Sequence, residues 1–414
     1  MRAPRSAPGN GVHSAVAMGA ERVSVESALA TCEPIVAHLR MLAEHISARP
    51  AGTGNAGEAR RYIKQTIQRI GGSPETHPFS MVIPRYQHCA LMTDTGRLIP
   101  CLPALGSAST PGVLRAIPNP WRDGIAGDVQ ADREDSFLLC PVGPNPVDAY
   151  TRFASERKAA GVILYHPNVP DLYSEVLPRR DEGVPCVTVR RADAEWLAQE
   201  QLPVRLHVAR APVKISCSNI LVEVGTVGRP LLLLAHYDTR PASPGALCNA
   251  SGTAILLELF SRLRGWSGPR ILLGFLDGEE LGASGSRHCR DVLHAMGTLK
   301  HLRGVIYVSD IGLQPVRTLS PTRDSTSQRS SVAGQTRLVT VAKQCVVDGK
   351  IALADDPADP GHTPIPPGVW SCPTIGLAGP PLSVRHTTAD RPGFIHPKHL
   401  FATVTALNRL VHAL

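Results

Sequence analysis

Long apolar runs are absent from this sequence of 414 residues. The longest aliphatic run is Leu231–Ala235, whereas a membrane-spanning helix needs about 20 apolar residues. Residues 1–30 contain basic side chains but no apolar stretch of the length that a signal peptide requires. These absences predict a cytoplasmic protein with no membrane partner.

Lysine is also scarce, because only seven of the 43 basic residues are lysines. The formal net charge is +8, yet no block of five like charges occurs, and the arginines are scattered among prolines and alanines. A nucleic-acid-binding face needs basic residues clustered together, so the pattern predicts no nucleic-acid partner.

Neither paired cysteines nor an unusual composition marks the chain. Its ten cysteines form no C-x-x-C pair, and a disulfide framework is not expected in a chain of this length. Hydrophobic residues make up 43% and charged residues 19%, the balance of an ordinary globular protein. We therefore expect a reduced, folded protein with a substantial core.

Hydrophobic patterning divides the chain into three parts. Residues 1–28 are expected to be a flexible tail. Residues 29–84 and 214–414 are expected to form the main domain, which opens with two amphipathic helices and continues, after Ser216, with alternating strands and helices. That alternation predicts an α/β fold with a mostly parallel, mixed sheet and helices on both faces. Short apolar runs broken by proline and glycine predict a small inserted α/β domain over residues 85–213.

Metal-type side chains follow several of the predicted strands. In open α/β sheets, ligands bind beyond the carboxyl ends of the strands, and histidine and carboxylate groups suit Zn²⁺. Taken singly, each residue has an ordinary interpretation: a lone histidine is usually structural, and paired glutamates usually lie in a solvated loop. The ordered set of H-x-D, G-A-x-x-N-A-S-G, D-G-E-E, S-D-I-G and R-H-T-T-x-D segments favours a metal site. Its candidate residues are His236, Asp238, Asp277, Glu279, Glu280, Asp310 and His386.

In these segments the sequence resembles the co-catalytic zinc exopeptidases, which include bacterial leucyl aminopeptidases, glutamate carboxypeptidase and the glutaminyl cyclases. The resemblance covers residues 33–84 and 216–414 and implies a phosphorylase/hydrolase-like fold. The intervening segment resembles a protease-associated domain, and its strongest cues are Arg157–Ile163 and Val184–Val187.

The resemblance also implies roles for individual residues. His236 and Asp310 would hold one zinc ion, and Glu280 and His386 would hold the other. Asp238 would orient the His236 ring. Glu279 would be the general base that takes a proton from metal-activated water and passes it to the leaving amine.

Cys248 departs from the family pattern, because it stands where family members place the aspartate that bridges the two metals. Three interpretations remain open. The Cys248 thiolate could bind or bridge zinc. The site could instead hold one zinc ion, as in the single-zinc glutaminyl cyclases. Alternatively, Cys248 could be a packing residue in a degenerate site.

The implied function is zinc-dependent hydrolysis of a peptide or amide bond, with one or two Zn²⁺ per chain. Aminopeptidase activity on a peptide or a small amide with a free amine is the first expectation. A single-zinc acyl-transfer, cyclising or biosynthetic amidase activity is an alternative, and a non-catalytic peptide-binding protein is another. Loops such as Leu319–Ser331 and the inserted domain are expected to form the walls of the substrate pocket.

Overall fold

The computed structural model describes most of the chain outside the amino terminus. The described residues are 25–121, 136–142, 147–177, 183–313, 317–319, 332–347, 366, 368–379 and 384–414. Most of the expected tail lies outside them, although helix α1 already begins at Val25. Among the described residues, no helix is both long enough and apolar enough to cross a membrane.

Four parallel strands form the centre of the main sheet, in the order β13-β11-β9-β10. Leu231–Leu234 are fully buried within β9, as expected for a parallel strand that is covered on both faces. The antiparallel strands β12 and β8 flank this centre, so the sheet is mixed, as the sequence predicts. The bounds are β8 Val204–Val224, β9 Val227–His236, β10 Pro269–Leu276, β11 Gly304–Ser309, β12 Arg317–Leu319 and β13 Thr374–Ala378.

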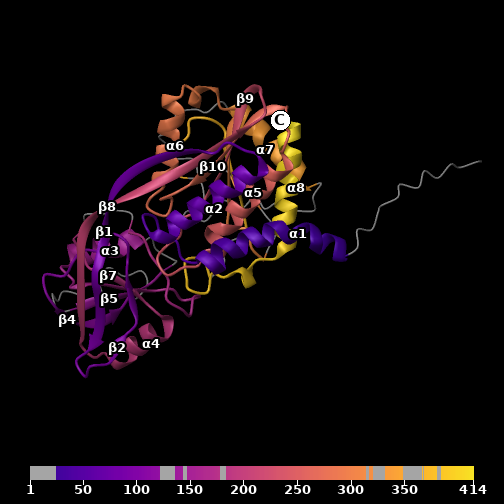
Figure 1. Cartoon of the computed structure of the whole chain (residues 1–414). Helices are drawn as coiled ribbons and strands as arrows, with labels where there is room; N and C mark the ends of the chain where they lie inside the picture. Colours follow the sequence, from indigo (N-terminus) through magenta and orange to yellow (C-terminus); the bar gives the residue numbers. More distant parts are fainter. Residues whose placement is uncertain are drawn as a thin grey trace, which may run out of the picture.

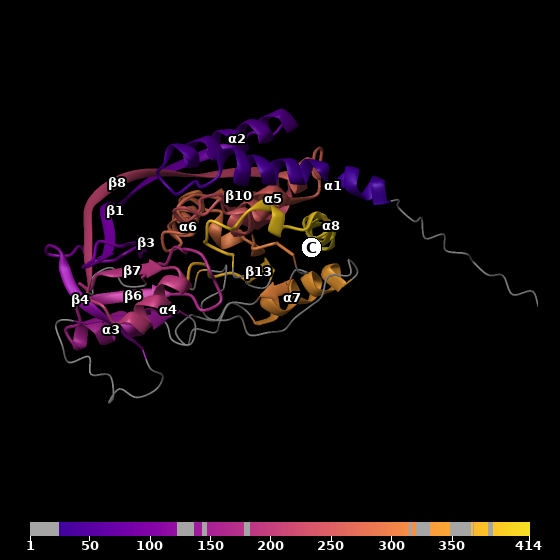
Figure 2. The same ribbon diagram turned by 90° about the horizontal axis from the view of Figure 1, so that it is seen from below.

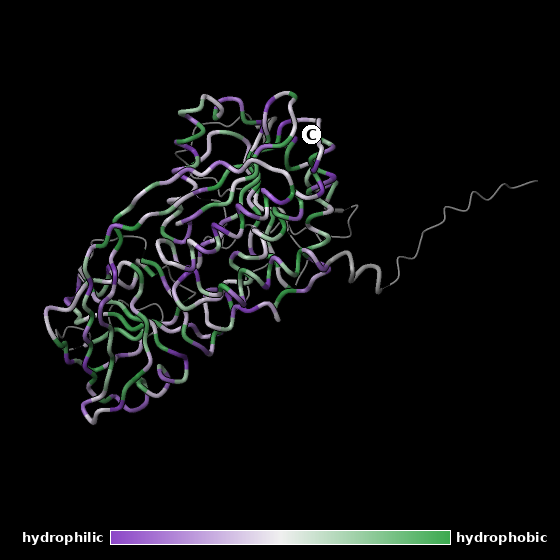
Figure 3. The backbone as a smooth tube through the Cα atoms, in the orientation of Figure 1, coloured by the Kyte–Doolittle hydropathy of each residue, from purple (hydrophilic) through white to green (hydrophobic). Residues whose placement is uncertain are grey.

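Helices cover both faces of this sheet, as the sequence predicts. One face packs against α1, α2, α5, α7 and α8, and the other packs against α6. Figure 3 shows the apolar segments gathered inside these layers. The bounds are α1 Val25–Arg40, η1 Met41–Ile46, α2 Gly54–Ile70, η2 Ala246–Ala250, α5 Ser251–Arg262, α6 Ser284–Ala295, η3 Leu299–His301, α7 Val332–Val347, η4 Pro392–Phe394 and α8 Pro397–Ala413.

A second lobe lies at one end of the molecule (Figure 1) and has apolar clusters of its own. It contains a sheet in the order β4-β5-β6-β7-β3, and β2 pairs with β1 beside it. Its elements are β2 Leu98–Ile99, β3 Cys101–Pro103, β4 Leu114–Pro120, β5 Ser136–Pro141, α3 Val147–Glu156, β6 Gly161–Tyr165, β7 Cys186–Val189 and α4 Arg191–Glu200. Strand β7 ends at Val189, and helix α4, which buries Ala194 and Leu197, follows.

A two-stranded ribbon joins the lobes. Strand β1, Glu75–Thr93, pairs antiparallel with β8 along almost its whole length, and both strands run from the main sheet into the second lobe (Figure 2). The expected domain boundaries, near residues 84 and 214, therefore lie within continuous strands. Apolar patterning misses these long strands because their central residues are largely half-buried or exposed.

Candidate metal centre

Three donor atoms converge beyond the carboxyl ends of β9 and β10. The Sγ atom of Cys248 lies 3.7 Å from His236 Nε2 and 3.1 Å from Glu280 Oε1. All three donors lie within 4.8 Å of one another. Tetrahedral zinc with ligands at 2.0–2.3 Å holds neighbouring donors about 3.4 Å apart. The three side chains therefore fit a zinc ion with three protein ligands, which leaves a fourth position for a substrate or water.

Asp238 connects His236 to the two glutamates. The Nδ1 atom of His236 lies 3.1 Å from the backbone oxygen of Asp238 and 3.4 Å from its Oδ1 atom, so Nε2 is directed towards Cys248. The Asp238 carboxylate also accepts hydrogen bonds from the backbone N–H groups of Glu279 and Glu280, at 3.2 and 3.1 Å. Burial lowers the pKa of His236, but the hydrogen bond and charge of Asp238, together with the glutamates, raise it to about 9. The buried Asp238 carboxylate thus fixes the carboxyl end of β9 relative to the segment that follows β10.

Glu279 is not one of the three converging donors, and its carboxylate contacts helix α6. Its carboxylate accepts hydrogen bonds from the Ser286 hydroxyl at 2.7 Å and the Ser286 backbone N–H at 2.9 Å. Burial raises the pKa of Glu279 to about 7, even though Ser286 opposes the shift. A carboxyl group that titrates near neutral pH can both accept and return a proton.

The loop that carries Cys248 is held by two buried residues from distant parts of the chain. The Asp390 carboxylate accepts hydrogen bonds from the backbone N–H groups of Leu247 and Cys248, at 2.6 and 3.3 Å. The Arg49 side chain donates to the backbone oxygens of Pro244 and Gly245, at 2.7 and 2.9 Å. Cys248 itself is 1% exposed, and burial keeps the pKa of its thiol well above the usual value.

Glu280 contacts side chains from three other parts of the chain. Besides the Cys248 thiol, it contacts His386 Nε2 at 3.1 Å and Arg240 Nε at 2.8 Å. Burial raises its pKa, but His386 and Arg240 more than compensate and hold it well below the usual range. Burial and the two neighbouring arginines lower the pKa of His386 to about 3.

Asp310 lies outside the three-donor cluster. Arg385 Nε donates to its Oδ1 atom at 3.0 Å, and the Ser309 hydroxyl donates to Oδ2 at 3.1 Å. Both Asp310 and His386 have positive φ angles, 56° and 63°, which are unusual for side chains other than glycine. The described structure thus brings together His236, Cys248 and Glu280, with His386 beside Glu280, but leaves Asp310 paired with an arginine.

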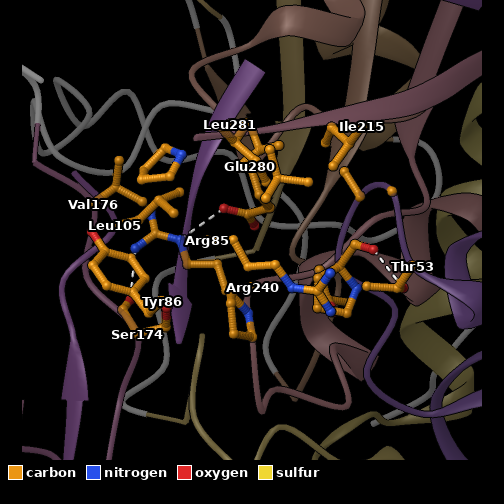
Figure 4. Close-up of a pocket in the computed structure, with 18 of the residues that line it drawn as sticks. Thr53, Arg85, Tyr86, Leu105, Ser174, Val176, Ile215, Arg240, Glu280 and Leu281 are labelled. Carbon is orange, nitrogen blue, oxygen red and sulfur yellow. Dashed lines mark hydrogen bonds and ion pairs between the residues drawn. The ribbon is translucent and has the colours of Figure 1, made fainter. Parts of the chain in front are cut away.

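A cavity of about 510 Å³ opens next to Glu280, between the two lobes. Its lining is mainly apolar, with Ile83, Leu105, Val176 and Ile215 among the contributors, and it also includes the Arg85 and Arg240 side chains (Figure 4). The second lobe therefore provides part of the pocket wall, as expected. The other expected wall, 320–331, lies outside the described residues.

The second lobe also contacts the site directly. Arg240 donates to the backbone oxygen of Ser174 at 2.7 Å while it pairs with Glu280 (Figure 4). Ser174 N–H donates to the backbone oxygen of His386, and Tyr173 and Thr387 form an isolated β-bridge. Arg240 is thus the residue that connects the second lobe to the carboxylate at the metal centre.

Comparison with known proteins finds a family model that matches part of the chain. Residues 219–359, which include His236, Cys248, Glu280 and Asp310, match peptidase family M28. The match and the fold fit the co-catalytic zinc exopeptidases. This confirms the family resemblance inferred from the sequence.

Individual known proteins are similar to this chain in sequence or in fold. The chain is 28% identical over 274 residues to aminopeptidase YwaD of Bacillus subtilis, an alignment that covers 62% of this chain and 56% of the relative. The fold of this chain is similar to that of BSAP, a zinc aminopeptidase from Bacillus subtilis. The TM-score is 0.75, and the identity is 21% over 92% of this chain and 94% of BSAP. A glutaminyl cyclase from Fimbriiglobus ruber has a TM-score of 0.52 and 12% identity, over 92% of this chain and 95% of that one.

Sequence reasoning missed the residues that support the donors. Ser286, Arg240 and Arg49 have no telling spacing to the metal-type residues, and their contacts depend on tertiary structure. One signal was available for Arg385, because it directly precedes the candidate ligand His386.

Proposed function

We propose that this protein is a zinc-dependent aminopeptidase, which removes the N-terminal residue of a peptide or small amide. The observation that carries the proposal is the convergence of His236 Nε2, Cys248 Sγ and Glu280 Oε1 beside a cavity large enough for a short peptide. The comparisons support zinc-dependent peptide hydrolysis as the general class.

In the proposed mechanism, bound zinc would polarise the scissile carbonyl and activate water. The chain supplies proton transfer and orientation. Glu279 takes a proton from the attacking water and delivers it to the leaving amine, a role that its pKa of about 7 supports. Asp238 holds His236 and the backbone of Glu279 and Glu280 in fixed relative positions.

The cavity supports a substrate with an apolar side chain. Its apolar wall suits a residue such as leucine, and Arg85 at the wall suits a negatively charged group further along the substrate. In the part of the chain that the structure describes, Arg85 has no ion-pair partner, so its guanidinium is available to a ligand.

A single-zinc acyl-transfer or cyclising activity is the second candidate. It is favoured by one observation, that the convergent donors form a three-ligand set for one ion. Loss of ammonia or water from the substrate, without release of a free amino acid, would identify this activity.

The deciding experiment combines metal analysis with an activity panel. Protein purified without chelator should contain zinc and should release free amino acid from chromogenic amino-acid amides, with preference for apolar side chains. Protein that holds no zinc after dialysis against zinc and hydrolyses none of the panel would support a non-catalytic peptide-binding role instead.

We also propose that residues 85–213 are an inserted, protease-associated-like domain in a cytoplasmic protein. Separate apolar clusters in the second lobe support the first part. For the second part, the nine cysteines whose side chains the structure describes are free, as expected in a reducing compartment.

A further inference from the structure

A buried ion pair occupies Asp310, which the sequence resemblance places beside His236 as a zinc ligand. Asp310 is fully buried, and Arg385, whose side chain is 21% exposed, donates to it at 3.0 Å. The other carboxylate oxygen of Asp310 accepts from Ser309. Both oxygens of this candidate ligand therefore already have donors from the protein.

Glu280 is also paired with an arginine, but in a different way. Glu280 pairs with Arg240, but that pair uses Oε2 and leaves Oε1 directed at Cys248. The contacts of Asp310 differ, because neither of its oxygens joins the three-donor cluster. A divalent ion placed on Asp310 would also lie next to the Arg385 cation, and like charges repel strongly where water is excluded.

A buried carboxylate needs a cation or several hydrogen bonds nearby. In a two-metal centre the second ion provides that positive charge, whereas here a fixed guanidinium provides it. The substitution of Cys248 for the bridging aspartate fits the same arrangement, since a three-ligand set of His236, Cys248 and Glu280 does not require a bridge to a second ion.

We propose that this chain is a one-zinc protein, in which Arg385 replaces the second metal ion as the partner of Asp310. The single zinc would be held by His236, Cys248 and Glu280. This inference rests on the zinc binding of the proposed function and specifies the number of ions and the reason for it.

The test counts metal ions and needs no activity measurement. The metal-free wild-type protein is titrated with Zn²⁺ against a chromophoric chelator, in parallel with Arg385→Gln and the control Arg391→Gln. Arg391 is an exposed arginine of the same segment and bonds to the backbone oxygen of Thr388. We expect one equivalent of zinc in the wild type and in the control, and a second equivalent in Arg385→Gln.

A double variant covers the case in which Arg385→Gln does not fold. Arg385→Gln/Asp310→Asn removes both charges and keeps the two side chains close to their original size, and it should retain one equivalent of zinc. Two equivalents in the wild type, a single equivalent in folded Arg385→Gln, or loss of zinc from the double variant would overturn the inference. Two equivalents in the wild type would leave the proposed function intact, whereas no zinc in the wild type would remove both.

Discussion

Glu279 receives two hydrogen bonds from Ser286, one from the hydroxyl and one from the backbone N–H, so a single residue of helix α6 fixes both oxygens of the carboxylate. The Ser286 hydroxyl in turn lies 2.6 Å from the hydroxyl of Tyr307, on strand β11. Glu279 is therefore held by the helix and the sheet together, and not by the metal ligands.

Removal of the Glu279 carboxylate should stop proton transfer without loss of metal. We expect Glu279→Gln to lower turnover by about 10² to 10⁴ and to keep the zinc content of the wild type. Steady-state kinetics and elemental analysis provide the two readouts. A Glu279→Gln protein that loses its zinc would show that Glu279 is a ligand and that the roles of the two glutamates are wrongly assigned.

Cys248 should be needed for metal binding. Cys248→Ala removes one of three donors, so zinc affinity should fall by about tenfold or more, and the sulfur-to-cobalt charge-transfer absorption of the cobalt-substituted protein should disappear. Cys289→Ala is the matched control, because Cys289 is equally buried but lies on helix α6. If both variants hold zinc as tightly as the wild type, Cys248 is a packing residue.

Arg49 should contribute strongly to stability. Its fully buried side chain donates to five backbone oxygens, those of Leu42, Ser47, Tyr237, Pro244 and Gly245. Arg49→Met leaves these acceptors without their donor and should lower the free energy of unfolding by about 3 to 5 kcal/mol.

Urea denaturation measures this difference. Arg40→Met is its control, because Arg40 is exposed and forms a long ion pair with Glu44, so the change should stay within about 0.5 kcal/mol. Equal effects of the two variants would show that the hydrogen bonds of Arg49 do not stabilise the fold.

Arg85 should favour substrates that carry a carboxylate. Arg85→Met should raise KM by about tenfold for dipeptides with a free C-terminus and leave KM for the corresponding amides unchanged. The control is Arg264→Met. Arg264 precedes the amino end of β10, whereas the site lies beyond its carboxyl end. A variant that affects acids and amides equally would indicate loss of pocket shape and no recognition of charge.

Acid should destabilise the protein partly through His38, which contacts the Tyr62 hydroxyl. Burial lowers the pKa of His38 from 6.5 to about 4 in the folded chain. Between these values the unfolded state binds more protons, so the free energy of unfolding falls as the pH drops from about 6.5 to 4. His38→Gln should show a smaller fall over that window in denaturation curves. An unchanged pH dependence would contradict the burial of His38.

The sequence predicts the main sheet well because its strands are continuously apolar and its ligands follow them directly. The strand-end positions of His236, Glu280 and Asp310 can be read from the sequence in this way. The pairing of Asp310 with Arg385 cannot, because it joins residues 75 positions apart through a side-chain rotamer that no periodicity specifies.

The second lobe is harder to predict for a different reason. Strands β1 and β8 form a partly exposed ribbon, so their residues alternate between more and less buried positions instead of forming the continuous apolar runs of the central strands. Helix α4 follows β7 after a single residue, so no glycine or proline marks the boundary between the two elements in the sequence.

The ribbon of β1 and β8 also offers a site for protein engineering. Ile83 and Val213 face each other across it, so a two-residue turn could close the backbone there after excision of the intervening segment. Pairing from Glu75 to Ile83 would remain intact. The resulting minimal scaffold would keep the candidate ligands and lose the outer wall of the pocket. In such a truncated chain, the contribution of the lobe to substrate selection could be measured separately from the chemistry of the metal centre.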